Sequence, residues 1–114
     1  MSLALVLAML YHAVLSEAWP SLHFTNKKTF HIMIFEDFHF GEGPDTDWGP
    51  SQDDNTLKVM QDILDNESPG LVVLNGDLIT GQNNFKENAT DYMDKIVAPL
   101  VEAGLPWAST YGSG

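Results

Sequence analysis

Apolar positions fall along the chain in blocks of two kinds, which predict alternating strands and helices. Some blocks, such as 30–35 (FHIMIF) and 71–74 (LVVL), are short, continuous and typical of strands buried on both faces. In the others, apolar residues recur at the three- and four-residue spacing of one helix face. The predicted order is strand 30–35, a helix from Ser51 or Asp53 to about 66, strand 71–74, helix 89–103 ended by Gly104, and strand 105–111.

This βαβαβ alternation predicts an α/β unit with parallel strands joined by right-handed crossovers. Open parallel sheets bind ligands beyond the carboxyl ends of their strands. Polar residues follow the carboxyl ends of the first two predicted strands, as EDFHFGEG after the first strand and NGD after the second. Because neither the Rossmann nor the P-loop glycine pattern occurs, the polar residues do not indicate a nucleotide site.

Three of these polar residues are candidate metal ligands. Asp37 and His39 form a D-x-H pair, which in an extended segment directs both side chains to the same side. Asp77 follows the neighbouring strand and is expected close to them, although alone it would indicate only a turn or a helix cap. Carboxylates with an imidazole suit Zn, Mn or Fe, and a carboxylate shared by two such ions supports hydrolysis of phosphate esters by an activated water.

Four stretches carry a family resemblance that spans residues 30–112. The segments IFEDFHFGE, WGPSQDDNT, LVVLNGDLITG and LPWASTYG resemble the calcineurin-like metallophosphoesterases, above all the fungal secreted or vacuolar phosphatases related to purple acid phosphatases. The resemblance implies the βαβαβ start of a four-layer α/β/β/α fold and a two-metal phosphatase acting on a phosphoester substrate. It also implies that Asp37 and His39 bind the first ion and that Asp77 bridges the two ions.

The chain departs from the family pattern in two places. The family continues with GNH and an acidic residue, whereas here Gly112 is followed by Ser113 and Gly114, and the later histidine ligands are absent. Thr80 stands where purple acid phosphatases have a tyrosine, so a tyrosinate-ligated iron is not expected. We therefore expect residues 19–114 to be a truncated N-terminal half that is inactive alone and binds at most one ion weakly.

Two other interpretations of the ending stay open. In one, the chain is a non-catalytic product that binds a partner, or a second copy of itself, through its open sheet edge. In the other, the reading frame is wrong just after Tyr111 or Gly112. A domain selected to stand alone is expected to end after an element and not inside a loop.

The N-terminal residues predict passage through the secretory pathway. The apolar run Leu3–Leu15 has the length of a signal-peptide core and is too short to span a bilayer, and Ser16-Glu17-Ala18 suits cleavage after Ala18. Residues 1–18 are therefore expected to be a signal peptide, the alternative being a buried N-terminal helix. A secreted or vacuolar protein could be glycosylated at Asn88 (NAT) or at Asn66 (NES).

Composition narrows the classes of function. Of 114 residues, 16 are acidic and 5 basic, and the net charge of -11 opposes binding to nucleic acids. With 44% hydrophobic residues the chain is expected to fold, as one small domain, and without cysteine it can form no disulfide. The remaining histidines are not expected to be ligands: His12 lies in the predicted signal peptide, His23 lacks supporting context and His31 is expected in the core.

Overall fold

The computed structural model describes residues 21–81 and 86–112, which form a three-stranded parallel sheet with two helices. The predicted α/β order is confirmed. The expected signal peptide 1–18, His12, Ser113 and Gly114 lie outside the described residues. The elements are β1 (Ile32–Phe35), α2 (Gly49–Asn66), β2 (Leu71–Asn75), α3 (Lys86–Glu102) and β3 (Trp107–Thr110).

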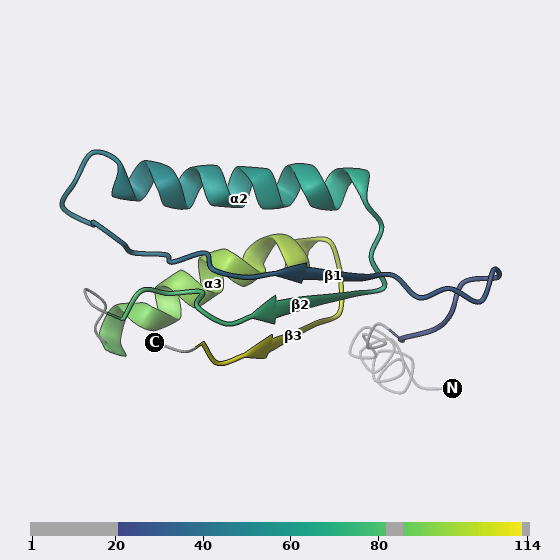
Figure 1. The fold of residues 1–114 in the computed structure, drawn as a ribbon. Coiled ribbons are helices and arrows are strands. Elements are labelled where there is room, and N and C mark those ends of the chain that lie inside the picture. Colours follow the sequence, from purple (N-terminus) through teal and green to yellow (C-terminus); the bar gives the residue numbers. More distant parts are fainter. Residues whose placement is uncertain (1–20, 82–85, 113–114) are drawn as a thin grey trace, which may run out of the picture.

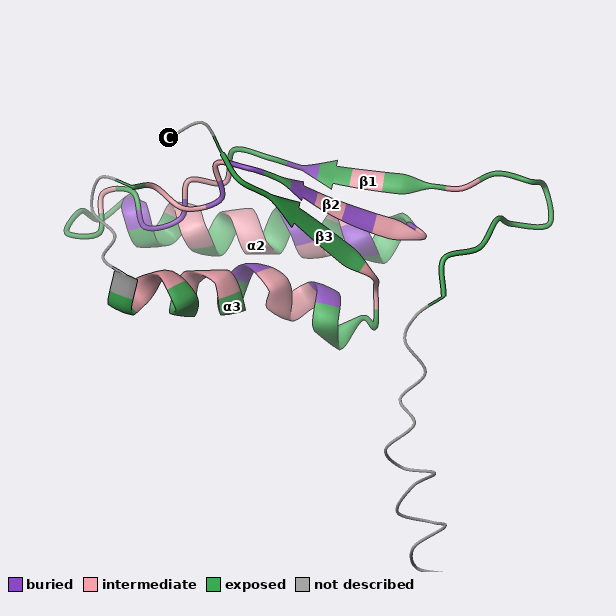
Figure 2. Ribbon diagram, turned by 90° about the horizontal axis from the view of Figure 1, so that it is seen from below, coloured by how far each residue is buried: buried purple, intermediate pink, exposed green. Residues whose placement is uncertain are grey.

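The strands lie in sequence order, β1-β2-β3, with α2 and α3 on the same face of the sheet (Figure 1). Ile34 of β1 pairs with Val73 of β2, which in turn pairs with Ala108 of β3. Two successive right-handed crossovers that advance in the same direction place both helices on one face. Figure 2 shows this two-layer arrangement from a second side.

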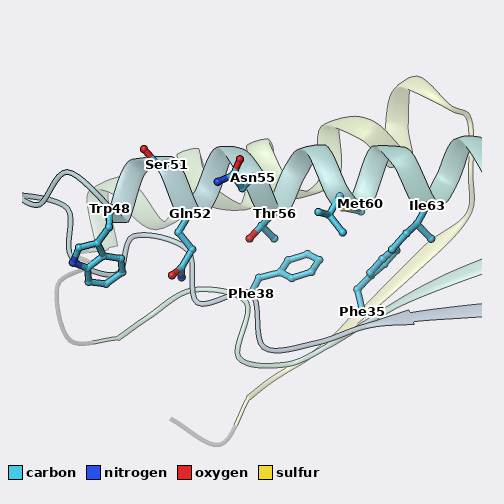
Figure 3. Close-up of a pocket in the computed structure, with 10 residues that line it drawn as sticks. Phe35, Phe38, Trp48, Ser51, Gln52, Asn55, Thr56, Met60 and Ile63 are labelled. Carbon is cyan, nitrogen blue, oxygen red and sulfur yellow. The ribbon is translucent and has the colours of Figure 1, made fainter.

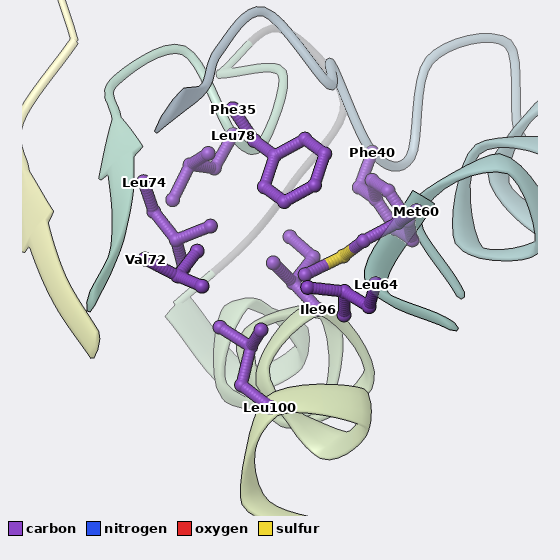
Figure 4. Packing of buried hydrophobic residues seen from close by; sticks show 9 residues of the cluster. All are labelled: Phe35, Phe40, Met60, Leu64, Val72, Leu74, Leu78, Ile96 and Leu100. Carbon is purple, nitrogen blue, oxygen red and sulfur yellow. The ribbon is translucent and has the colours of Figure 1, made fainter. Parts of the chain in front are cut away.

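The hydrophobic core lies between the sheet and the two helices (Figure 4). Every second residue of the central strand enters it, because side chains alternate between the faces of a strand. Val72 and Leu74 are accordingly buried, whereas Leu71 and Val73 are only partly buried. The buried apolar residues are Phe35, Phe40, Met60, Leu64, Val72, Leu74, Leu78, Ile96 and Leu100.

The expectation that the first strand is buried on both faces is wrong. Ile32 and Ile34 are 48% and 59% exposed, and only Phe35 of β1 is buried. All four residues of β3 are exposed as well. Both helices cover the same face, so among the described residues nothing covers the other face. His31, expected in the core, is also exposed.

Several predicted boundaries shift. Helix α2 begins at Gly49, before Ser51, because Pro50 needs no N–H partner in a first turn and the Thr46 hydroxyl accepts the Gly49 N–H at 3.1 Å. Helix α3 begins at Lys86 instead of Ala89, and β1 and β3 are shorter than their apolar runs. Within the described part of the chain, no helix is both long and apolar enough to cross a bilayer.

The predicted stop at Gly104 is confirmed. Gly104 has φ 63°, and its N–H donates to the Val101 carbonyl at 3.0 Å. The Leu105 N–H reaches back to the Leu100 carbonyl at 2.9 Å, which completes a Schellman motif. This turn directs the chain from α3 into β3.

Candidate metal centre

The loops that follow β1 and β2 are joined to each other by main-chain hydrogen bonds. The N–H groups of Asp37, His39 and Phe40 donate to the carbonyls of Gly76 (3.3 Å), Asp77 (3.0 Å) and Leu78 (2.9 Å) respectively. The side chains of Phe40 and Leu78 are buried in the core. Parallel pairing therefore continues past the strand ends, as the isolated bridge between Phe40 and Ile79 also shows.

The structure brings Asp37, His39 and Asp77 together at this edge of the sheet. One ligand atom from each residue lies within 4.8 Å of the other two, and His39 Nε2 is 3.9 Å from Asp37 Oδ1. Two ligands of a tetrahedral ion, each bound at about 2.1 Å, are about 3.4 Å apart. Closing the group around one ion therefore requires the most distant ligand atoms to approach each other by up to about 1.4 Å. Two carboxylates and an imidazole are a donor set that fits Zn, Mn or Fe.

All three candidate ligands have left-handed backbones. The φ angles of Asp37, His39 and Asp77 are 56°, 51° and 46°. The interpretation of the D-x-H pair as an extended segment is therefore wrong, although the two side chains do meet. Such conformations cost a residue with a side chain about 1–2 kcal/mol each, and they gather at functional sites.

Two glycines allow the third loop, after β3, to lie against Asp77. A Cβ atom on Gly76 would stand 2.8 Å from Gly112 Cα and 2.9 Å from the Tyr111 carbonyl oxygen. A Cβ atom on Gly112 would stand 2.8 Å from Asp77 Cγ and would overlap Asp77 Oδ1. The three strand-end loops thus meet around the Asp77 carboxylate.

A row of polar side chains beside this group was not predicted. The Asn75 Nδ2 donates to Glu36 Oε2 at 3.0 Å, and the Thr110 hydroxyl donates to Asn75 Oδ1 at 3.5 Å. Ile34, Val73 and Ala108 are paired across the three strands, and Glu36, Asn75 and Thr110 each follow one of them by two positions. The period-two pattern of each strand, taken with the register, would have placed them together.

Asp53 was also not predicted to belong to the site, because the sequence indicated it only as a possible start of a helix. Its carboxylate, on α2, accepts the Gly41 N–H at 3.1 Å and 3.3 Å, one distance to each oxygen. Loss of solvent raises the pKa of Asp53, an effect opposed by the Gly41 hydrogen bond and by the charge of Lys95. No local sequence signal joins Asp53 to a loop twelve residues away.

A groove of about 540 Å³ adjoins the ligand loop on its helix side (Figure 3). Phe38, which lies between Asp37 and His39 in the chain, points into it from one side, and Gln52 and Thr56 of α2 face it from the other. None of the residues that line it is charged. They are Phe35, Phe38, Trp48, Ser51, Gln52, Asn55, Thr56, Val59, Met60 and Ile63.

The remaining predicted site residues lie away from the metal group. Asn66, the last residue of α2, is exposed and its side-chain amide donates to the Asp62 carbonyl at 2.7 Å. Asn88 lies in the first turn of α3 and is partly buried. His23 is exposed and its Nδ1 lies 2.9 Å from the Ser21 carbonyl oxygen.

Comparison with curated proteins finds phosphatase relatives. The chain is 29% and 32% identical over 100 residues to Probable inactive purple acid phosphatases 28 and 14 of Arabidopsis thaliana. These matches cover 81% of the chain and 25% of each relative. Phosphatase DCR2 of Saccharomyces cerevisiae is 33% identical over 96 residues, which cover 78% of the chain and 16% of that protein.

No known family profile matches the chain. No solved structure matches it either. The chain spans about a quarter or less of the length of these curated relatives. It is nevertheless similar over most of its own length to the two plant proteins named as purple acid phosphatases and to the yeast phosphatase.

Proposed function

We propose that this chain forms the metal-holding edge of a metal-dependent phosphoester hydrolase. The observation that carries the proposal is the convergence of Asp37, His39 and Asp77, whose ligand atoms lie within 4.8 Å of one another. The group stands at the carboxyl edge of a parallel sheet, where such folds bind ligands. The names of the relatives, which are phosphatases, supply the reaction class.

In this proposal Asp37 and His39 would hold a first ion, and Asp77 would supply a carboxylate oxygen to that ion and to a second one. Divalent ions at these positions would stabilise phosphoryl oxygens and lower the pKa of a bound water. The side chains of Asp37 and His39 are 65% and 45% exposed, so a phosphoester can approach them from solvent. A phosphate anion would be repelled by the two carboxylates alone, which makes cation binding a precondition for substrate binding.

Residues 1–114 are expected to bind one ion weakly and to show no turnover. Asp37, His39 and Asp77 supply three donors, whereas a closed zinc site has four. The two plant relatives are themselves named as probable inactive phosphatases.

The test is calorimetric titration of the full chain with Mn²⁺ and with Zn²⁺. Asp77→Asn should lower the affinity about 10-fold or more because a charged ligand is lost, and Asp54→Asn, which removes an exposed charge from α2, should not. Hydrolysis of p-nitrophenyl phosphate is assayed in parallel. Equal affinities of the wild type and Asp77→Asn would remove the basis of the proposed site.

A second candidate function is association with another copy of this chain through the sheet. Ile32 and Ile34 are exposed, and among the described residues neither β1 nor β3 has a strand partner on its outer side. Such edges pair readily with another chain. Ile34→Lys should then shift a dimer to monomer in analytical ultracentrifugation, whereas Val101→Lys, at an equally exposed apolar residue of α3, should not. A wild-type chain that stays monomeric at millimolar concentration would contradict this candidate.

We further propose that residues 1–18 direct secretion or vacuolar delivery and that Asn88 or Asn66 is glycosylated. Expression in a eukaryotic secretory host should yield a product beginning at Trp19, detected by N-terminal sequencing. Treatment with a glycosidase should lower its mass, and Asn88→Gln should abolish part or all of that change. An N-terminus at Met1 in the secreted material would contradict the cleavage.

A further inference from the structure

The loop that carries Asp37 and His39 is held in an unusual backbone conformation. Left-handed residues alternate along it, with φ 56° at Asp37, 51° at His39, 79° at Gly41 and 56° at Gly43. Glycine adopts such angles freely, but Asp37 and His39 do not, and these two residues keep this conformation only if their surroundings fix it. The position of the His39 imidazole therefore depends on what holds the loop.

The amide groups of the loop show which contacts hold it. The N–H groups of His39 and Phe40 donate to carbonyls of the neighbouring loop, and the N–H of Glu42 donates to His39 itself at 3.3 Å. The N–H of Gly41 instead donates to the Asp53 carboxylate of α2, at 3.1 Å and 3.3 Å. Of the main-chain amides at residues 39–42, that of Gly41 is thus the one that donates to a side chain. This bond to Asp53 fastens the loop to α2.

The surroundings of Asp53 disfavour its charged form, although two contacts oppose this effect. Asp53 is partly buried, and with Tyr92 and Lys95 of α3 it lines a hollow of about 200 Å³ beside Gly41. Loss of solvent disfavours its charged form, and Asp54 next to it adds repulsion. The Gly41 hydrogen bond and the charge of Lys95 offset these effects, and an amide bonded to an ionised oxygen is held more strongly than one bonded to a neutral acceptor.

We propose that Asp53 is a positioning residue for the metal group: it fixes Gly41 and thereby the loop geometry that brings His39 to Asp37 and Asp77. The consequence for metal binding rests on the proposed function, whereas the consequence for the loop does not. Asp53 itself contacts neither an ion nor a substrate in this role.

The experiment compares the full-length chain with Asp53→Ala, Asp53→Asn and Asp54→Ala. Asp54→Ala removes the same charge from the neighbouring, exposed position and is the matched control. Three quantities are measured: Mn²⁺ affinity by calorimetry, exchange of the Gly41 and His39 amides by NMR, and urea stability. We expect Asp53→Ala to weaken Mn²⁺ binding roughly 10-fold and to speed Gly41 exchange by at least a similar factor. Asp53→Asn, which keeps an acceptor oxygen, should lie between it and the wild type.

The outcomes separate this proposal from the proposed function. If the wild type binds Mn²⁺ and Asp53→Ala matches Asp54→Ala in affinity, the positioning role is wrong and the metal site stands. If the wild type binds no Mn²⁺, the proposed metal function fails, and amide exchange then tests the positioning role of Asp53 by itself. Faster exchange at Gly41 and His39 in Asp53→Ala, but not in Asp54→Ala, supports that role, and unchanged exchange refutes it. If Asp53→Ala does not fold, the same comparisons are made with Asp53→Asn.

Discussion

Replacing Gly112 by alanine tests the closeness of the three loops at the candidate metal centre. The φ angle of Gly112 is not in the left-handed region, so alanine is conformationally acceptable and its effect is steric. The new Cβ would overlap Asp77 Oδ1 and the Asp77 main-chain nitrogen, and it would stand 2.8 Å from Asp77 Cγ, about 0.7–1.2 Å short of an ordinary contact between carbon atoms. Either Asp77, with its main chain, or the β3 loop must therefore move by at least this distance.

A movement of this size matters because the candidate ligand atoms must already approach one another to hold an ion. They lie within 4.8 Å of one another, whereas two ligands of one tetrahedral ion are about 3.4 Å apart. In the proposed site, moving Asp77 outward would remove a ligand, so we expect Mn²⁺ affinity to fall about 10-fold or more. Overpacking costs about 1–3 kcal/mol of folding stability in addition.

The assay is Mn²⁺ calorimetry on folded Gly112→Ala, with urea unfolding to record its stability. Gly81→Ala is the control, because a Cβ there has nothing within 4 Å and Gly81 also lacks a left-handed φ. It should bind Mn²⁺ as the wild type does. A folded Gly112→Ala that binds Mn²⁺ within twofold of the wild type would refute the close approach of Gly112 to Asp77, or the part of Asp77 in the site.

Three further predictions concern stability. Leu74→Ala should lower the free energy of unfolding in urea by about 2–5 kcal/mol because Leu74 is fully buried, whereas Ile34→Ala, at a largely exposed position, should change it by about 0.5 kcal/mol or less. Gly104→Ala should cost about 1–2 kcal/mol through the left-handed φ alone, since a Cβ there meets no atom within 4 Å; a neutral result in the same assay would contradict the Schellman turn. Burial raises the pKa of Asp53, so the folded state binds this proton more tightly than the unfolded chain. The contribution of Asp53 to stability therefore falls as the pH rises from below about 3.9 through the folded-state pKa, and Asp53→Asn should remove that fall from urea titrations at successive pH values.

The order of the elements could be predicted because each rests on a local signal. The runs at 30–35 and 71–74 and the stop at Gly104 marked strands and a helix end that the structure contains. The exposure of Ile34 could not be predicted in this way. A continuous apolar run looks the same whether one face of its sheet is covered or both, and which face is covered depends on the direction of two crossovers.

The site shows the same division between local and long-range information. That Asp37, His39 and Asp77 meet follows from where parallel strands end, and the structure brings them together. The bond from Gly41 to Asp53 joins residues 12 apart, and the bond from Asn75 to Glu36 joins residues 39 apart. The first bond has no signature in the residues next to it, and the second follows from the strand pattern only once the register of the strands is known.

The left-handed backbones at the three candidate ligands carry a further consequence. At about 1–2 kcal/mol each, Asp37, His39 and Asp77 together cost about 3–6 kcal/mol, a large share of the 5–15 kcal/mol that stabilises an ordinary domain. Glycine at these positions would relieve that cost but supplies no donor atom. Asp and His also adopt such angles in ordinary turns, but a turn alone does not require three of them within 4.8 Å of one another, with their loops joined by main-chain bonds and by Asp53, whereas the proposed metal site does.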